Sequence, residues 1–242
     1  MLGSAHSISD PNVALNTIMA EELCKFAQEL EQAADFDTAL QELICRTLKE
    51  HQRIIFGGNG YSHEWEEEAA RRGLCNLRST ADALATYISE KNIDLVTRHK
   101  IFTEEELRAR HDIHMDAYCK IINIEAQTSI DMVLRQILPA ALSYTKSLCD
   151  SALAKRQLGL SSNTEDALIA RLTEATDSLF KKCELLRTDL GHIPSEREKA
   201  VVYYHDVILS GMSSIRSDAD LLEQHTDKAF WPYPTYADLL FY

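Results

Sequence analysis

Apolar residues recur three or four positions apart along most of the chain, and polar residues fill the positions between them. This spacing places the apolar side chains on one face of an α-helix. The longest such segment runs from Glu104 to about Gln157, and two more follow at 164–191 and 195–225. No run of alternating apolar and polar residues is long enough to predict a β-strand. The pattern therefore predicts an all-α fold, in which long antiparallel helices joined by short turns form a bundle.

The longest predicted helix has a clear start and an internal proline. Thr103 and Glu106 form the capping-box pattern T-x-x-E at its start. A straight helix of this length would span ~80 Å at ~1.5 Å per residue, so we expect part of it to protrude as a helical arm. Pro139 has no backbone N–H to donate, so it is expected either to kink the helix or to divide it in two.

Shorter helices are predicted in the N-terminal part. Asp10 and Pro11 form a pattern typical of a helix start, and a second helix is expected after Asp37. Gly73 is expected to stop an acidic helix, and Thr80 to cap the next one. The apolar stripe of the first helix consists of Val13, Ile18, Met19, Leu23, Phe26 and Leu30.

Three regions follow from this organisation. Residues 1–101 are predicted to hold short helices and a glycine-rich turn, 102–229 the long-helix bundle and its arm, and 230–242 an aromatic tail. An aromatic chain end fixed by prolines has too much apolar area to stay in water, so it must dock, either on its own helices or on a neighbouring domain or subunit. The docking residues are Phe230, Trp231, Tyr233, Tyr236 and Phe241.

Three of the eight glycines lie in the segment "RIIFGGNGYSHEW", residues 53–65. It lacks the lysine of a Walker loop, and the dinucleotide pattern G-x-G-x-x-G is absent as well, so a phosphate site is not favoured. The segment instead predicts a structural turn with positive φ at several positions, and Ser62 as the cap of the next helix. The turn residues are Gly57, Gly58, Asn59, Gly60 and Tyr61.

Composition and charge exclude some classes of partner. The 242-residue chain has 45% hydrophobic residues, 26% charged residues and a net charge of −13, so it has no basic excess for a nucleic-acid backbone. No apolar run approaches the length of about 20 residues that crosses a bilayer, so no membrane partner is expected. The six cysteines are scattered singly, without a signal peptide, which predicts free thiols in a cytoplasmic protein.

The histidines do not form a recognisable metal or catalytic motif. His63 begins an H-E-x-x-H pattern, but Glu67 takes the place of its second histidine. His111 and His114 are spaced to share a metal ion, but the carboxylate partners of a di-iron site are missing, so both are expected to be solvated on a helix face.

Two polar residues beside the apolar stripe of the longest helix have two possible interpretations. Asn123 and Glu125 belong either to a buried polar network or to the wet side of that helix. The residues taken by themselves therefore predict no catalytic, cofactor-binding or metal-ligating residue.

A more specific pattern runs through the chain from end to end. Its segments are "SISDPNVALNTIMAEEL" (7–23), "RIIFGGNGYSHEW" (53–65), "RGLCNLRSTADAL" (72–84), "FTEEELRARHDIHMDAYCKIINIEAQTSIDM" (102–132), "ILPA" (137–140) and "WPYPTYADLLF" (231–241). With these segments in this order, the chain resembles the C-terminal helical region of type III glutamine synthetases. It departs from the family at Gly57, where asparagine is usual, at Cys75 (proline), at Ala109 (serine), and in "SDPN" at 9–12, where the family has "AGPN".

The resemblance implies an activity for the whole enzyme. Glutamine synthetases are ATP-dependent glutamate–ammonia ligases that act through a γ-glutamyl phosphate held by Mg²⁺ or Mn²⁺. The family's metal, ATP and substrate residues precede the region that this chain resembles, so none is carried over and the chain is expected to be inactive alone. It is then the C-terminal part of a longer enzyme, either as an isolated piece or as the product of a shortened gene. On this resemblance, residues 1–101 are expected to be the end of the catalytic-domain region.

The resemblance also implies partners. The family forms a dodecamer of two stacked hexameric rings, so the expected partners are the remainder of the enzyme chain and neighbouring subunits in a homo-oligomer. The chain is expected to support the catalytic part and to help build the oligomer. The alternative is an independent helical protein-interaction module.

Overall fold

The computed structural model describes residues 7–240, and the described part of the chain is helical with no β-strand. The predicted all-α fold is confirmed. The chain divides into two compact units, Met1–Ile113 and His114–Tyr242, and the helix α6 contributes residues to both. The sequence-based division at 101/102 and 229/230 stays a prediction, and so does the protruding arm.

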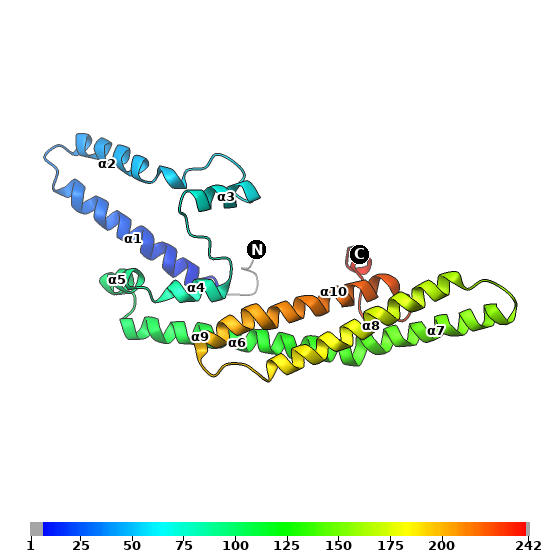
Figure 1. Cartoon of the computed structure of the whole chain (residues 1–242). Coiled ribbons are helices and arrows are strands. Elements are labelled where there is room, and N and C mark those ends of the chain that lie inside the picture. Colours follow the sequence, from blue (N-terminus) through cyan, green and yellow to red (C-terminus); the bar gives the residue numbers. More distant parts are fainter. Residues whose placement is uncertain (1–6, 241–242) are drawn as a thin grey trace. The chain divides into compact units, whose positions relative to one another are not determined.

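The N-terminal unit contains short helices that are labelled in Figure 1. Within this unit, α1 packs against both α2 and α5. The helices are α1 (Ser9–Glu31), α2 (Phe36–Glu50), the 3₁₀ turn η2 (Gln52–Ile54), α3 (His63–Arg71), α4 (Thr80–Tyr87) and α5 (Glu90–Arg98).

Three of the helix starts predicted in the N-terminal part are wrong by one or two positions. Helix α2, expected after Asp37, begins at Phe36 with Asp35 as its N-cap. Helix α1 begins at Ser9 with Ile8 as its N-cap, so Asp10 lies in the first turn, where a carboxylate favours the helix dipole. Ser79, rather than Thr80, caps α4, because its hydroxyl accepts a hydrogen bond from the Asp82 N–H at 3.0 Å. Gly73 does follow α3, with a φ of 69° that glycine adopts readily.

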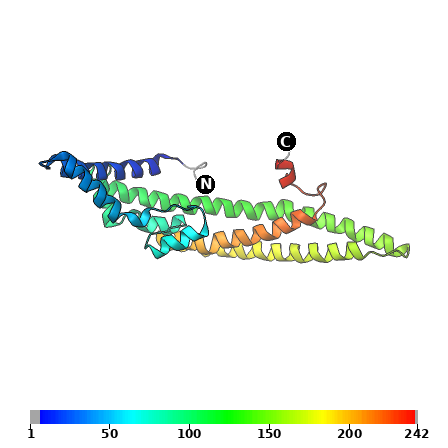
Figure 2. The same cartoon turned by 90° about the horizontal axis from the view of Figure 1, so that it is seen from above.

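The C-terminal unit is built from long helices that lie alongside one another in both perpendicular views (Figures 1 and 2). Helix α8 packs against both α7 and α10. The elements are α6 (Glu104–Met132), η3 (Val133–Ile137), α7 (Leu138–Gln157), α8 (Asn163–Leu190), α9 (Arg197–Tyr203), η4 (Tyr204–Ile208), α10 (Leu209–His225) and α11 (Tyr236–Leu240).

The capping box predicted at the start of α6 is present. The Thr103 N–H donates to Glu106 Oε2 at 2.8 Å, and the Glu106 N–H donates to Thr103 Oγ1 at 3.2 Å. Two backbone donors of the first turn, which have no partner inside the helix, are thereby satisfied.

Pro139 neither ends nor divides the long helix. A π turn, η3, precedes it, and the Leu138 N–H donates to the Val133 carbonyl five residues back. In a regular α-helix the proline ring would clash with the carbonyl four residues before it. The wider π turn takes these carbonyls out of α-helical register, so α6, η3 and α7 continue as one helix through Pro139.

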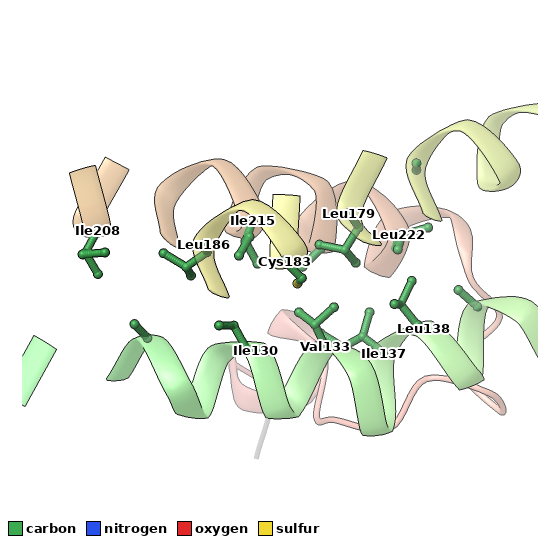
Figure 3. Packing of buried hydrophobic residues seen from close by; sticks show 14 of the residues in the cluster. Ile130, Val133, Ile137, Leu138, Leu179, Cys183, Leu186, Ile208, Ile215 and Leu222 are labelled. Carbon is green, nitrogen blue, oxygen red and sulfur yellow. The ribbon is translucent and has the colours of Figure 1, made fainter. Parts of the chain in front are cut away.

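One apolar cluster forms the core of the C-terminal unit. Figure 3 shows Ile130, Val133 and Ile137 pointing towards Leu179 and Cys183 of α8. Helix α10 completes the cluster from a third side with Ile215 and Leu222, among other residues. A second π turn, η4, contributes Tyr204 and Ile208 to the same core.

Candidate functional site

The glycine-rich loop connects η2 to α3, but it is not the turn that its sequence predicts. Among the glycines of described backbone, positive φ occurs at Gly73 and Gly159 and not at Gly57, Gly58 or Gly60. The reason for a glycine is steric at Gly58, where an added Cβ would lie 2.5 Å from the Phe56 ring. This glycine therefore allows an aromatic ring to lie against the backbone.

Arg72 holds the start of this loop in place. Its Nη1 donates to the carbonyls of Arg53 at 3.1 Å and Ile55 at 2.8 Å. Its Nε pairs with Glu68 one turn earlier in the chain. A planar guanidinium suits this task, because its donors serve several acceptors at once.

Two aromatic rings pack beside the same guanidinium. Phe56 and Trp65 are stacked with ring centroids 4.5 Å apart and an interplanar angle of 28°. The Arg72 guanidinium carbon lies 6.0 Å from the Phe56 centroid and 5.7 Å from the Trp65 centroid, within reach of cation–π attraction. Arg72 thus links the loop to α3 by packing against these two rings as well as by hydrogen bonds.

The tip of the loop faces solvent. Tyr61 is 101% exposed, and its N–H donates to the Asn59 side-chain oxygen at 3.0 Å. Ser62 occupies the N-cap position of α3, but its hydroxyl donates to the Asn59 carbonyl at 2.8 Å and does not cap the helix, so that part of the prediction is wrong. The loop is an anchored, tyrosine-tipped projection.

A charged cluster that the sequence did not reveal joins α1 to the end of α5. Glu21 is almost fully buried; its Oε1 accepts from Arg98 at 2.5 Å and its Oε2 from His99 Nε2 at 2.7 Å. The His99 hydrogen bond, with help from Lys25 and Arg98, lowers the pKa of Glu21 against the opposing effect of burial. Arg98 and His99 lie more than 70 residues from Glu21 in the sequence, so no short-range motif could have predicted the contact.

The two histidines of α6 differ from expectation. His111 is buried, donates from Nε2 to the Leu84 carbonyl at 3.0 Å and stacks on Tyr87, so its predicted solvation is wrong. The Leu84 carbonyl of α4 accepts this hydrogen bond, which offsets the cost of removing the polar imidazole from water. His114 is half-buried, and no group of three potential metal ligands occurs in residues 7–240.

The remaining polar candidates lie in water. His63 is exposed and pairs with Glu66 and Glu67 of its own helix. Glu125 is exposed and half-buried Asn123 accepts from Gln127, which favours the wet side of the helix over a buried network.

The six cysteines are free thiols, as predicted. Burial raises the pKa of Cys183 to about 11, and it also raises the pKa of Cys119. Because the reactive species is the thiolate, buried Cys183 and half-buried Cys119 act as packing atoms of the core and not as nucleophiles.

The aromatic tail rests on the C-terminal unit itself. Trp231 and Tyr233 pack against the core cluster, and Phe230 lies 5.4 Å from Tyr144, measured between ring centroids. The side chain of Tyr236 and the whole of Phe241 lie outside the described residues. The predicted docking surface is therefore intramolecular for the three aromatic residues whose side chains are described.

A hydrogen bond and an ion pair within the tail also hold it in place. Asp238 accepts from the Thr235 N–H at 2.9 Å and pairs with Lys228. The Lys228 hydrogen bond, followed by those from Thr235, lowers the pKa of Asp238 to about 2. This carboxylate thus closes the ten-residue connection from Lys228 to α11.

Comparisons with known proteins place this fold in a family. Residues 39–156 match the family model of the glutamine synthetase C-terminal domain. The chain is 34% identical over 206 residues to a glutamine synthetase of Butyrivibrio fibrisolvens, covering 84% of this chain and 29% of that protein. The chain therefore belongs to the glutamine synthetase C-terminal domain family.

Two further relatives extend the match to nearly the whole chain. A type-3 glutamine synthetase of Dictyostelium discoideum is 31% identical and a glutamine synthetase of Bacteroides fragilis is 29% identical; each comparison covers 99% of this chain and 34% of the relative. The chain is thus similar to a type III enzyme and spans about a third of the length of the relatives it matches. Across residues 7–240, no helix is long and apolar enough to span a membrane.

Proposed function

We propose that this chain is the supporting C-terminal part of a type III glutamine synthetase, and that it acts with a catalytic part that makes glutamine from glutamate, ammonia and ATP. On this proposal, ATP and Mg²⁺ or Mn²⁺ are held by the catalytic part in the cytoplasm, and this chain contributes to a homo-oligomer. The similarity to three glutamine synthetases over 84–99% of the chain supports the assignment.

The observation that carries the supporting role is the inverted polarity of α1. Its buried residues are Thr17 and Glu21, both polar. Four of its apolar residues face outward: Leu15 is 61% exposed and Leu23 is 60% exposed, and Ile18 and Met19 are exposed with them. Since these side chains recur at helical spacing, they form one apolar face, which is called the α1 face below.

An apolar face of this kind marks a surface that another protein part covers. The helix uses its polar side to pack against α5, so the α1 face is available for the catalytic part of the enzyme. Burial of an exposed leucine stabilises by about 1.5–3 kcal/mol, so even partial burial of this face would hold the two parts together.

A chimeric enzyme tests this function. The segment of the Bacteroides fragilis glutamine synthetase that matches this chain is replaced by this chain, and glutamine formation and the mass by light scattering are measured. We expect an active, assembled enzyme, and loss of both on Leu15→Asp combined with Leu23→Asp. The matched control is Leu142→Asp, also at an exposed leucine but on α7.

Two results would overturn the proposal. One is full activity and assembly of the Bacteroides enzyme after deletion of the matching segment. The other is γ-glutamyl transfer by this chain alone with Mg²⁺ or Mn²⁺, which would place catalytic residues within it. A chimera that assembles normally with both aspartates would show that the α1 face does not contact the catalytic part.

A further inference from the structure

A cavity of about 250 Å³ lies in the C-terminal unit between the aromatic tail and the helices beneath it. One wall comes from the tail, with Trp231 and Tyr233, and another from α10, with Asp220 and Glu223. Ile137 of the π turn η3 belongs to the mostly apolar remainder. The cavity therefore exists only because the tail is docked, and it combines aromatic rings with carboxylates.

The charged groups around the cavity leave one negative charge without a partner. Arg216 lines it too, and its Nε donates to Asp220 Oδ1 at 2.6 Å, so these two charges compensate each other. Glu223 is half-buried and makes no hydrogen bond or ion pair with any described residue. A carboxylate held beside apolar walls without a partner favours the arrival of a cation.

The aromatic side chains favour the same kind of ligand. The faces of tryptophan and tyrosine rings attract cations, and their area accommodates an apolar group. The Tyr233 hydroxyl is buried and finds no hydrogen-bond partner in residues 7–240, and burial raises the pKa of this phenol. An organic cation with an apolar body therefore matches both the carboxylate of Glu223 and the aromatic rings that line the cavity.

We propose that this cavity binds a small organic cation, a protonated amine on an apolar body, with its ammonium group at Glu223 and its body against Trp231. The site is separate from the proposed enzyme function and does not depend on it. Anions are rejected by Glu223, and neutral analogues lose the charge pairing. Because the ligand contacts both α10 and the tail, its binding also stabilises the docked tail.

The two tryptophans of the chain allow a direct measurement. In a Trp65→Phe variant of the whole chain, Trp231 is the sole tryptophan and reports the cavity by its fluorescence. The variant is titrated with three matched probes: 2-phenylethylammonium, 2-phenylethanol and phenylacetate. We expect the ammonium probe to bind about tenfold more tightly than the alcohol, and phenylacetate more weakly than either.

Substitution of the carboxylate separates this site from non-specific binding. Glu223→Gln is expected to reduce the preference for the ammonium probe over the alcohol to about twofold or less, while binding of the alcohol stays unchanged. Glu174→Gln removes the same charge from an exposed position of α8 outside the cavity and is expected to keep the full preference.

Three results would overturn the proposal. They are equal binding of the three probes, a preference that survives Glu223→Gln, and the absence of ammonium binding by both fluorescence and calorimetry. Circular dichroism of each variant shows whether it is folded. Protease cleavage after residue 228 gives a second measurement. The ammonium probe is expected to slow this cleavage, and phenylacetate is expected to leave its rate unchanged.

Discussion

The two units of this chain are stabilised in opposite ways. In the C-terminal unit, apolar residues of α6, η3, α8 and α10 point inward and form one continuous cluster. In the N-terminal unit, the inward side of α1 is polar, and Glu21 joins it to the end of α5 by an ion pair with Arg98 and a hydrogen bond with His99. The apolar face of that helix is outside.

This difference indicates which unit is complete by itself. A buried apolar cluster gives the C-terminal unit its own source of stability. Although Glu21 is buried, its charged partners Arg98 and Lys25 remain 60% and 54% exposed, so their ion pairs contribute little. The N-terminal unit is therefore expected to be the less stable of the two until its α1 face is covered. Trp65 lies in one unit and Trp231 in the other, so single-tryptophan variants can follow the two unfolding transitions separately.

The largest effect is expected in the apolar core. Leu179 of α8 is fully buried, and Leu179→Ala should lower the unfolding free energy of the C-terminal unit by about 2–5 kcal/mol. Leu185→Ala on the same helix removes the same atoms from a side chain that is 61% exposed, so about 0.5 kcal/mol or less is expected. Urea unfolding followed at Trp231 in a Trp65→Phe background measures both. Equal losses would mean that the observed cluster is not the core.

In the N-terminal unit, the largest single effect is expected at Arg72. Arg72→Lys loses the hydrogen bonds to two loop carbonyls and the packing on Phe56 and Trp65, at a cost of about 1–3 kcal/mol. The amides of residues 57–61 should then exchange faster with deuterium. Arg71→Lys, which keeps an exposed ion pair with Glu68, is the control and should change neither quantity appreciably. Unchanged exchange in Arg72→Lys would show that the loop is held by something else.

Much of the fold followed from sequence because the strongest signals are local. The periodicity of α6–α10, the capping box at Thr103 and the stop at Gly73 depend on residues within a few positions of one another. The π turn η3 was not predicted, although Pro139 marked the place where the helix needed one. The second π turn, η4, has no proline and no sequence signal that we recognise.

The remaining errors concern contacts between distant segments. Of the stripe predicted for α1, Ile18, Met19 and Leu23 are exposed, whereas Val13, Phe26 and Leu30 are half-buried. The sequence did not show that Thr17 and Glu21 would be the buried residues of this helix. Burial of His111 depends on the Leu84 carbonyl of another helix. The glycine-rich loop needed glycine for the approach of Phe56 and not for positive φ. None of these contacts produces a periodic pattern or a motif in the sequence.

A pH-dependent effect is expected from the ion pairs of α1. The folded-state pKa of Glu21 lies below its ordinary value of 4.5, chiefly because His99 donates a hydrogen bond to it. Its contribution to stability is therefore fully present above about pH 4.5 and is lost as the pH falls through the folded-state pKa. Glu21→Gln should flatten the acid side of the melting-temperature profile of the N-terminal unit, measured at Trp65 in a Trp231→Phe background.

Glu31→Gln is the matched control for this titration, because Glu31 is exposed on the same helix. Its profile should follow that of the unsubstituted chain between pH 7 and pH 3. If the Glu21 and Glu31 variants show the same acid slope, the cluster around Glu21 does not control the acid stability of this unit. The C-terminal transition, followed at Trp231, should be insensitive to either change.

The smallest expected effect is a gain in stability on substitution of Lys100. This residue follows the last turn of α5, and the ends of helices in the two units can be compared directly. Helices α3, α5 and α7 end in the same way, with a left-handed residue after the last turn: Gly73 at φ 69°, Lys100 at φ 53° and Gly159 at φ 71°. The Ile101 N–H donates to the Val96 carbonyl at 2.9 Å, and the Leu160 N–H donates to the Lys155 carbonyl at the same distance. Lysine therefore occupies a conformation that suits glycine.

Lys100→Gly should stabilise the N-terminal unit by about 1 kcal/mol, because the side chain no longer crowds the backbone in this conformation. The reverse change, Gly159→Lys in the C-terminal unit, should cost about the same amount. Urea unfolding measures Lys100→Gly at Trp65 in a Trp231→Phe background and Gly159→Lys at Trp231 in a Trp65→Phe background. A loss of stability in Lys100→Gly would mean that the lysine side chain makes a stabilising contact that outweighs the backbone strain.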